Sequence, residues 1–172
     1  MIRSPILALA ALCMLAACAT TTESNLGPDG QPLPRAYKIR ASDTANIQFG
    51  TLDEVNALRQ AQGYRALELN SQLTAAAATH SRDMAVQNRP WNFGSDGSSP
   101  IERVARTGFP GEFRGEAIRE TFENEGTTLE EWLKDPTSRR IILDPEATDM
   151  GFSWDQEKSG KIWWTLVTGT RT

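Results

Sequence analysis

The sequence predicts an α+β fold in which helices cover both faces of a small, mainly antiparallel central sheet, forming an α-β-α sandwich. Helical patterns precede a pair of strands at the end of the chain. The last strand pattern, IWWTLVT at 162–168, is apolar on both faces and should therefore be covered on both sides. A length of 172 residues, of which 39% are hydrophobic and 23% charged, suits one compact domain with short appendages.

The first residues are expected to lie outside this fold. The stretch MIRSPILALAALCMLAAC contains Arg3, then an apolar run too short to span a bilayer, then small residues before Cys18. This order is typical of a secretory signal peptide, here residues 1–17. The end of the stretch resembles a bacterial lipobox, in which a peptidase cuts before the cysteine and the thiol then carries a diacylglycerol. The alternative is an ordinary signal cleavage nearby, with Cys18 incidental.

Residues 18–44 are predicted to be a lipidated tether, because Thr, Ser, Pro and Gly dominate and no apolar periodicity is present. Tyr37 and Ile39 are the only large apolar groups near its end, and they could pack on a domain formed by residues 45–172. The other cysteine, Cys13, falls in the signal segment, so the exported domain should contain no disulfide. Ala19, rather than Asp, follows Cys18, and resemblance to Gram-negative lipoproteins then implies an exported, lipid-anchored protein of the outer membrane.

Charge restricts the partners of the domain. The chain has 18 basic and 22 acidic residues, a formal net charge of −4. Nucleic-acid binding usually needs a basic face, and Arg139-Arg140 is the nearest approach to one. We therefore expect no nucleic-acid partner. The membrane, reached through the lipid on Cys18, is the first expected partner.

The helices are predicted in the following order. Thr51 and Glu54 form a capping-box pattern that opens a helix ending at Gly63. A second helix starts near Asn70 or Ser71 and ends near Asn88, and one of its faces carries Leu73, Ala77, His80 and Met84. A third starts after Ser99, with Pro100 in its first turn and Glu102 completing a capping box, and it closes at Gly108.

The remaining elements are a short strand near residues 116–120 and a helix near 128–134, which Pro136 ends before a turn and a short further helix. The stretches MGFSW and IWWTLVT, joined by QEKSGK, predict a hairpin. The segment WNFGSDGSSP at 91–100 is predicted to be a loop.

Four segments together resemble the bacterial branch of the CAP superfamily, the cysteine-rich secretory, antigen-five and pathogenesis-related group, also called SCP-like domains. They are LDEVNALRQAQGYRALELNSQLTAAAATHSRDMA at 52–85, GSDGSSPIERVARTGF at 94–109, RGEAI at 114–118 and WLKDPTSRRIILDPEATDMGFSW at 132–154. The resemblance covers nearly the whole expected domain. It implies the same sandwich fold and a cleft that, in many members, holds a divalent metal between two histidines and acidic residues.

Carried onto this sequence, the resemblance implies a degenerate cleft. The two histidine positions fall on Asn92 and Ser138, while the acidic positions fall on Glu116 and Asp135. Imidazole nitrogens are the usual ligands for zinc, so their loss leaves at best a weak hard-cation site. We therefore expect no metal and no cofactor. The one histidine, His80, is predicted to pack inside its helix face rather than act as a base.

Two functions remain open from the sequence. In the first, the domain is a non-enzymatic binding or scaffolding module for an envelope component, lipid or protein. Trp91 and Phe93, in a polar loop beside the former cleft, are then the binding candidates. In the alternative, Glu116 and Asp135 approach each other and support weak hydrolase-like chemistry. A purely structural role for Glu116, hydrogen-bonded to backbone amides, is the simpler interpretation.

Overall fold

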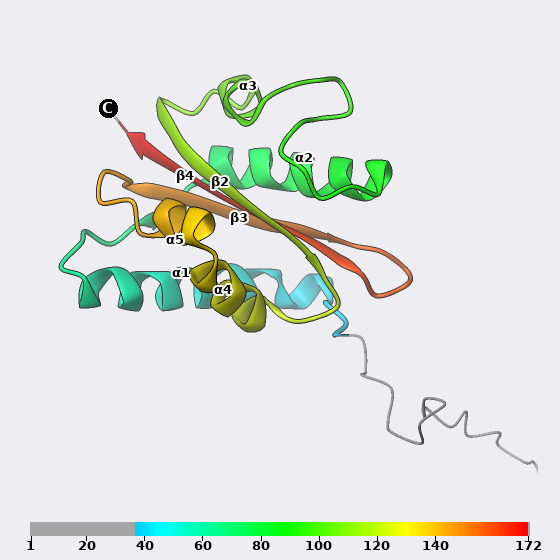
Figure 1. The fold of residues 1–172 in the computed structure, drawn as a ribbon, viewed down its shortest axis with the longest axis horizontal. Helices are drawn as coiled ribbons and strands as arrows, with labels where there is room; N and C mark the ends of the chain where they lie inside the picture. The colour runs from blue at the N-terminus through cyan, green and yellow to red at the C-terminus, as the bar shows by residue number, and fades with distance from the viewer. Residues whose placement is uncertain (1–36, 172) are drawn as a thin grey trace, which may run out of the picture. The chain divides into compact units, whose positions relative to one another are not determined.

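A computed structural model describes residues 37–171. The predicted signal peptide, the lipidation site Cys18 and most of the predicted tether lie outside the described residues. The helices and strands, shown in Figure 1, follow in the order α1 (Thr44–Ala61), β1 (Glu68–Leu69), α2 (Ser71–Gln87), α3 (Pro100–Arg106), β2 (Gly111–Thr121), α4 (Glu125–Lys134), α5 (Pro136–Ile142), β3 (Asp149–Gln156) and β4 (Ile162–Arg171), with a 3-10 turn at Ala41–Asp43 before α1.

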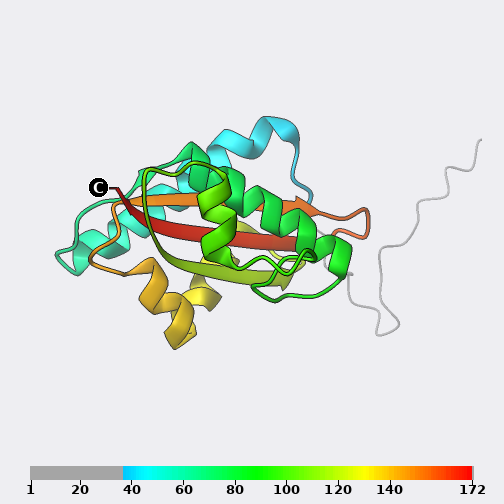
Figure 2. The same cartoon turned by 90° about the horizontal axis from the view of Figure 1, so that it is seen from above.

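The strands form one sheet in the order β1-β3-β4-β2. β4 is antiparallel to both of its neighbours, whereas β1 runs parallel to β3 over only two residue pairs. Helices α2 and α3 lie on one face of the sheet, and α1, α4 and α5 lie on the other (Figures 1 and 2). The predicted α-β-α sandwich with a mainly antiparallel sheet is therefore confirmed.

The core is divided by the sheet, as the two apolar faces of the last strand predicted. Trp164 and Leu166 of β4 join the larger cluster, with Trp132 of α4 and Phe152 of β3. Val167, the next residue along β4, belongs to the smaller cluster formed by α2, α3 and Phe109. Alternate side chains of a strand point to opposite faces, so one strand contributes to both clusters.

The first helix begins earlier than predicted. α1 starts at Thr44, and Thr51 lies in its interior with 2% of its surface exposed. The prediction that the helix opens at a Thr51 capping box was therefore wrong. Ile47 lies one turn before Thr51 and is buried in the core, so tertiary packing extends the helix past a local start signal.

The ordered domain also reaches back into the segment predicted as tether. Tyr37 and Ile39 pack against the larger core cluster, and the Ile39 amide donates a hydrogen bond to Gln156 Oε1 at 2.9 Å. These two residues belong to the domain, as the sequence suggested for them. The boundary at residue 45 therefore lies too late, because it excludes residues that the core holds in place.

Apart from β1, the helices and strands after α1 lie where they were predicted, but β2 and α4 are longer than expected. Ser99 caps α3 with its capping box to Glu102, as expected, and α2 begins at the predicted place, where the Asn70 side chain caps it. β2 extends over Gly111–Thr121 because it pairs with nearly the whole length of β4. The two-residue strand β1 was not predicted, since so short a stretch has no detectable periodicity.

A buried glutamate cluster as candidate functional site

Glu116 lies in the middle of β2 and points toward α2 and α3. Its neighbour Gly115 faces the other side of the sheet, where a Cβ added to that glycine would come within 2.7 Å of Ile141 in α5. Because successive strand residues alternate between faces, Glu116 must point away from α5. The position therefore assigns the carboxylate to the α2–α3 side of the sandwich.

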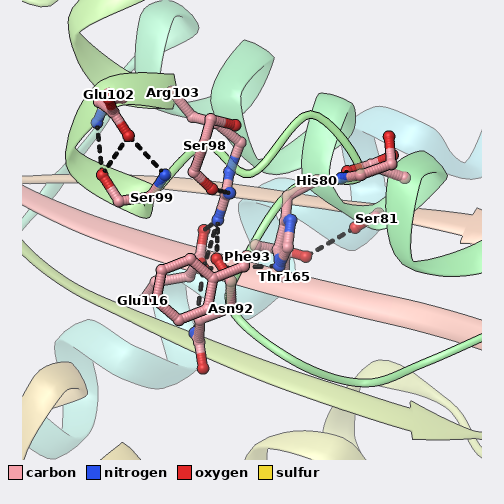
Figure 3. Close-up of polar contacts among 12 residues, drawn as sticks. His80, Ser81, Asn92, Phe93, Ser98, Ser99, Glu102, Arg103, Glu116 and Thr165 are labelled. Carbon is pink, nitrogen blue, oxygen red and sulfur yellow. Dashed lines mark hydrogen bonds and ion pairs between the residues drawn. The ribbon is translucent and has the colours of Figure 1, made fainter. Parts of the chain in front are cut away.

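Arg103 and Asn92 bind the carboxylate of Glu116, and Arg103 reaches both of its oxygens (Figure 3). Arg103 Nη2 lies 2.8 Å from Oε1 and 3.0 Å from Oε2, and Asn92 Nδ2 donates to Oε1 at 3.0 Å. The same guanidinium also donates to the carbonyl oxygens of Asn92 at 2.8 Å and Ser98 at 3.0 Å. These bonds connect β2, α3 and the 91–99 loop through one side chain.

The Arg103–Glu116 ion pair is almost completely removed from solvent. Only 4% of the Arg103 side chain and 2% of the Glu116 side chain are exposed. Burial raises the pKa of the Glu116 carboxyl, and the charge and hydrogen bonds of Arg103 oppose that change, assisted by Asn92. A carboxylate held this way has neither solvent nor a free oxygen available to accept a proton from a substrate, so the pair is a structural element.

His80 of α2 completes the cluster. It is fully buried, and its Nε2 lies 3.6 Å from Glu116 Oε1, too far for a hydrogen bond. Burial, followed by the positive charge of Arg103, lowers the pKa of His80 to about 4, while the Trp91 backbone and Asp83 act in the opposite direction. Among residues 37–171, neither ring nitrogen of His80 has a hydrogen-bond partner. His80 is therefore neutral at pH 7. Its predicted role in helix packing is confirmed, but its position behind Glu116 was not predicted.

The lowered pKa of His80 gives a testable pH dependence. The unfolded chain takes up a proton below its ordinary value of 6.5, whereas the folded chain does so only near 4, so stability falls as the pH drops through that interval. At pH 5 the loss should be about 2 kcal/mol. We expect His80→Met to be close to wild type in urea unfolding at pH 7 and more stable than wild type at pH 5. Equal pH dependence of the two proteins would contradict this assignment.

Asp135 and Ser138 lie together, but apart from Glu116. Asp135 is the N-cap of α5, and its Oδ2 accepts hydrogen bonds from the amide and hydroxyl of Ser138, both at 2.8 Å. These bonds lower the pKa of Asp135. The structure thus joins Asn92 with Glu116 and Asp135 with Ser138, and the sheet separates the two pairs. The suggested approach of Glu116 to Asp135 does not occur, because α5 packs beneath Gly115 on the opposite face.

The residues around Glu116 do not fit the divalent metal that the resemblance implies. Within residues 37–171, no three His, Cys, Asp or Glu side chains gather closely enough to hold a metal ion. At Glu116 a guanidinium already occupies the side of the carboxylate that a cation would take. Arg103 thus supplies the positive charge that compensates the buried carboxylate, in the place where a metal ion would have to bind.

Trp91 and Phe93, both in the 91–99 loop between α2 and α3, form a partly exposed aromatic surface. Their ring centroids lie 5.6 Å apart, and the Arg89 guanidinium stacks 3.8 Å from the Trp91 ring centroid. Trp91 Nε1 donates to Gln87 Oε1 at 2.9 Å, while 49% of Phe93 is exposed. Polar contacts with Gln87 and Arg89 therefore hold the Trp91 ring in position, while Phe93 remains exposed beside it.

Arg103 is the residue of this cluster that sequence reasoning missed. Helix α3 carries both Arg103 and Arg106 in its last turn, a pattern that usually indicates solvated positive charge. Arg106 is exposed and pairs with Asp96, whereas Arg103 points inward to Glu116. Both arginines stand near the end of the same short helix pattern, and nothing local in the sequence tells which of them is buried.

Comparison with known proteins identifies the family behind this fold. The model of the CAP, or cysteine-rich secretory protein, family matches residues 52–168. The chain belongs to the CAP family. CAP membership accounts for the three layers and for the resemblance of the four sequence segments.

Individual CAP relatives are distant. The chain is 28% identical to protein YkwD of Bacillus subtilis over 122 residues, which are 71% of this chain and 47% of the relative, so the match spans about half of that protein. An outer surface protein of Borrelia burgdorferi superposes with a TM-score of 0.66 at 14% identity, over 80% of this chain and 99% of its own. An extracellular SCP-domain protein of Bacillus anthracis gives 0.65 at 18% identity, over 78% and 45%. At these identities the two structures establish the fold alone.

Proposed function

We propose that the protein is a cell-envelope lipoprotein, anchored in the outer membrane by an acylated Cys18, whose CAP domain is a non-enzymatic module that binds or scaffolds an envelope component, lipid or protein. The observation that supports a non-enzymatic domain is the buried ion pair of Arg103 with Glu116. Both oxygens of the one acidic side chain in the cluster are bound, and 2% of that side chain is exposed. A general base needs access to the proton it removes.

The signal and lipobox patterns of residues 1–18 support export and anchoring. Two structural neighbours, one an outer surface protein and the other an extracellular protein, agree with an exported domain. Within the described part of the chain, no helix has the length and apolar character needed to cross a bilayer. Attachment through lipid on Cys18 is therefore the route we propose.

The Trp91–Phe93 surface is the proposed binding surface. It combines two aromatic rings with a cation over one of them, and the hydrogen bond from Trp91 to Gln87 fixes its geometry before a partner arrives. Rigid, partly exposed aromatic side chains provide large contact areas at a low entropic cost. The hydrolase-like alternative needs Glu116 beside Asp135, and their placement on opposite faces of the sheet removes its support.

The binding role is tested with immobilised protein carrying Cys18→Ala, exposed to a detergent extract of envelopes from the source cells. Bound lipid, glycan and protein are each quantified for wild type, Trp91→Ala and Phe122→Ala. Phe122 is a matched control, because 52% of it is exposed and it lies outside the loop. We expect Trp91→Ala to weaken retention of one component roughly tenfold, as for an aromatic anchor, while Phe122→Ala retains it. Equal loss in both variants would contradict a specific surface.

A further inference from the structure

A large open hollow lies on the side of the sandwich away from the Trp91–Phe93 surface. It has a volume of about 710 Å³ and is formed where the end of α1, the start of β2, α5 and the turn after α5 meet. Neither the proposed function nor the family resemblance gives it a role. Its walls are formed by Gln62, Tyr64, Arg114, Pro136, Arg139, Arg140, Leu143, Asp144, Pro145 and Glu146.

The wall of this hollow is held by a fully buried arginine. Arg59 of α1 donates hydrogen bonds to the carbonyl oxygens of Ile142 at 3.0 Å, Asp144 at 2.9 Å and Ala147 at 3.0 Å. A fourth bond, from its Nε at 2.9 Å, holds the Arg65 carbonyl beside Tyr64. One side chain therefore fixes the turn after α5 and the segment after α1 relative to each other. The hollow is preorganised, which reduces the ordering cost of binding.

Positive charge in the hollow is only partly compensated. Arg114 pairs with Asp144 through bonds of 2.8 and 3.3 Å. Arg139 and Arg140 are exposed, and within residues 37–171 neither side chain makes an ion pair or a hydrogen bond, although the charge of Arg140 helps to lower the pKa of Asp135. Glu146 is the other acidic group of the lining. The lining therefore carries three arginines and two carboxylates, in a chain whose overall net charge is −4.

The lining also offers apolar contacts beside these charges. Tyr64 is 36% exposed on one wall, and Pro136, Leu143 and Pro145 contribute aliphatic surface on the others. Small-ligand sites typically combine a mainly apolar lining with a few charged or polar groups that set orientation. The guanidinium groups supply forked donors whose geometry matches carboxylate and phosphate oxygens.

We infer that this hollow binds a small ring-shaped ligand that carries a carboxylate or a phosphate. Arg139 and Arg140 hold the anionic group, and Tyr64 with the prolines contacts the ring. This site lies on the α5 side of the sheet, and the Trp91–Phe93 surface lies over the other side. The two assignments are therefore independent, and failure of one leaves the other intact.

The test is an NMR titration of the Cys18→Ala chain with three sugars that share one ring: glucose 6-phosphate, glucuronate and neutral glucose. We expect either charged sugar, or both, to shift the backbone amides of residues 62–65, 137–144 and 146, and glucose to leave them unchanged. Saturation by both charged sugars identifies the shared oxyanion as the recognised group. Saturation by only one of the two charged sugars identifies its anionic group, phosphate or carboxylate, as the group that the hollow recognises.

Arg139→Gln combined with Arg140→Gln should weaken binding of the charged sugar roughly tenfold or more, because a charge-assisted contact is lost. The control, Arg40→Gln with Arg82→Gln, removes the same charge from exposed positions outside the hollow and should leave the affinity unchanged. Equal weakening by both pairs, equal shifts with glucose, or no saturable shift with any charged sugar would overturn the assignment. Inorganic phosphate that binds as tightly as glucose 6-phosphate would overturn the role of Tyr64.

Discussion

Replacing Glu116 with Gln should lower the free energy of unfolding by about 3 kcal/mol at pH 7. The substitution keeps the size of the side chain but leaves the Arg103 charge without its counter-charge at a position where 4% of that side chain is exposed. Gln can still accept one hydrogen bond from the guanidinium, which prevents a larger loss. Urea unfolding followed by tryptophan fluorescence measures the change.

Two controls separate the buried pair from general effects of charge. Glu112→Gln removes an exposed carboxylate from the same strand, and it should change stability by less than about 0.5 kcal/mol. Arg103→Met combined with Glu116→Gln removes both charges, and it should be more stable than Glu116→Gln alone. If the single Gln variant unfolds at the same urea concentration as wild type, the pair does not hold the α2–α3 side of the sandwich together.

Replacing Gly151 with Ala should have a comparable or larger effect, a loss of about 3 kcal/mol or more. Gly151 lies in β3 beneath the first turn of α2, and an added Cβ would fall 2.1 Å from the Leu73 carbonyl carbon and 2.2 Å from the Thr74 nitrogen. Both atoms belong to the backbone, so no side chain can rotate out of the way. Helix α2 would have to move off the sheet, and His80 and the Glu116 cluster would move with it. Thermal and urea unfolding both measure this loss.

Gly50→Ala is the matched control for this substitution. Gly50 lies inside α1, and an added Cβ there meets nothing within 4 Å. Since Ala favours a helix interior over Gly, this variant should gain about 0.5–1 kcal/mol. The same chemical change should therefore have opposite signs at the two glycines. A loss at Gly50 equal to that at Gly151 would show that close backbone packing of α2 is not the cause.

The candidate site was only partly predictable from the sequence, and the reason lies in strand alternation. Glu116 and Asn92 were both singled out from the sequence, and the structure joins them by a hydrogen bond of 3.0 Å. The family resemblance grouped Asp135 and Ser138 with them, but in the structure Asp135 caps α5 and binds Ser138. No local pattern tells which face of β2 a residue occupies, because the register of β2 is set by its pairing with β4.

Long-range contacts also explain the residues that no pattern indicated. Arg103 and Arg59 resemble ordinary helix-surface arginines in the sequence, yet both are buried, and their main partners lie on other segments of the chain. By contrast, Asn88, which ends α2 in a left-handed conformation, and Asp135, which caps α5, are residue types that favour these positions through local hydrogen bonds.

The sequence by itself determined the α-β-α sandwich, the C-terminal hairpin, the start of α2, the cap of α3 and the family, because periodicity, turn residues and motifs are local properties of the chain. The tertiary structure alone decided where charge is buried. The ion pair of Arg103 with Glu116 and the carbonyl bonds of Arg59 join residues that are distant in sequence, and only the packed sheet brings them within hydrogen-bond distance. These arginines and Glu116 lose their contact with water only when the helices pack on the sheet, and that loss of solvent makes the contacts strong and costly to break.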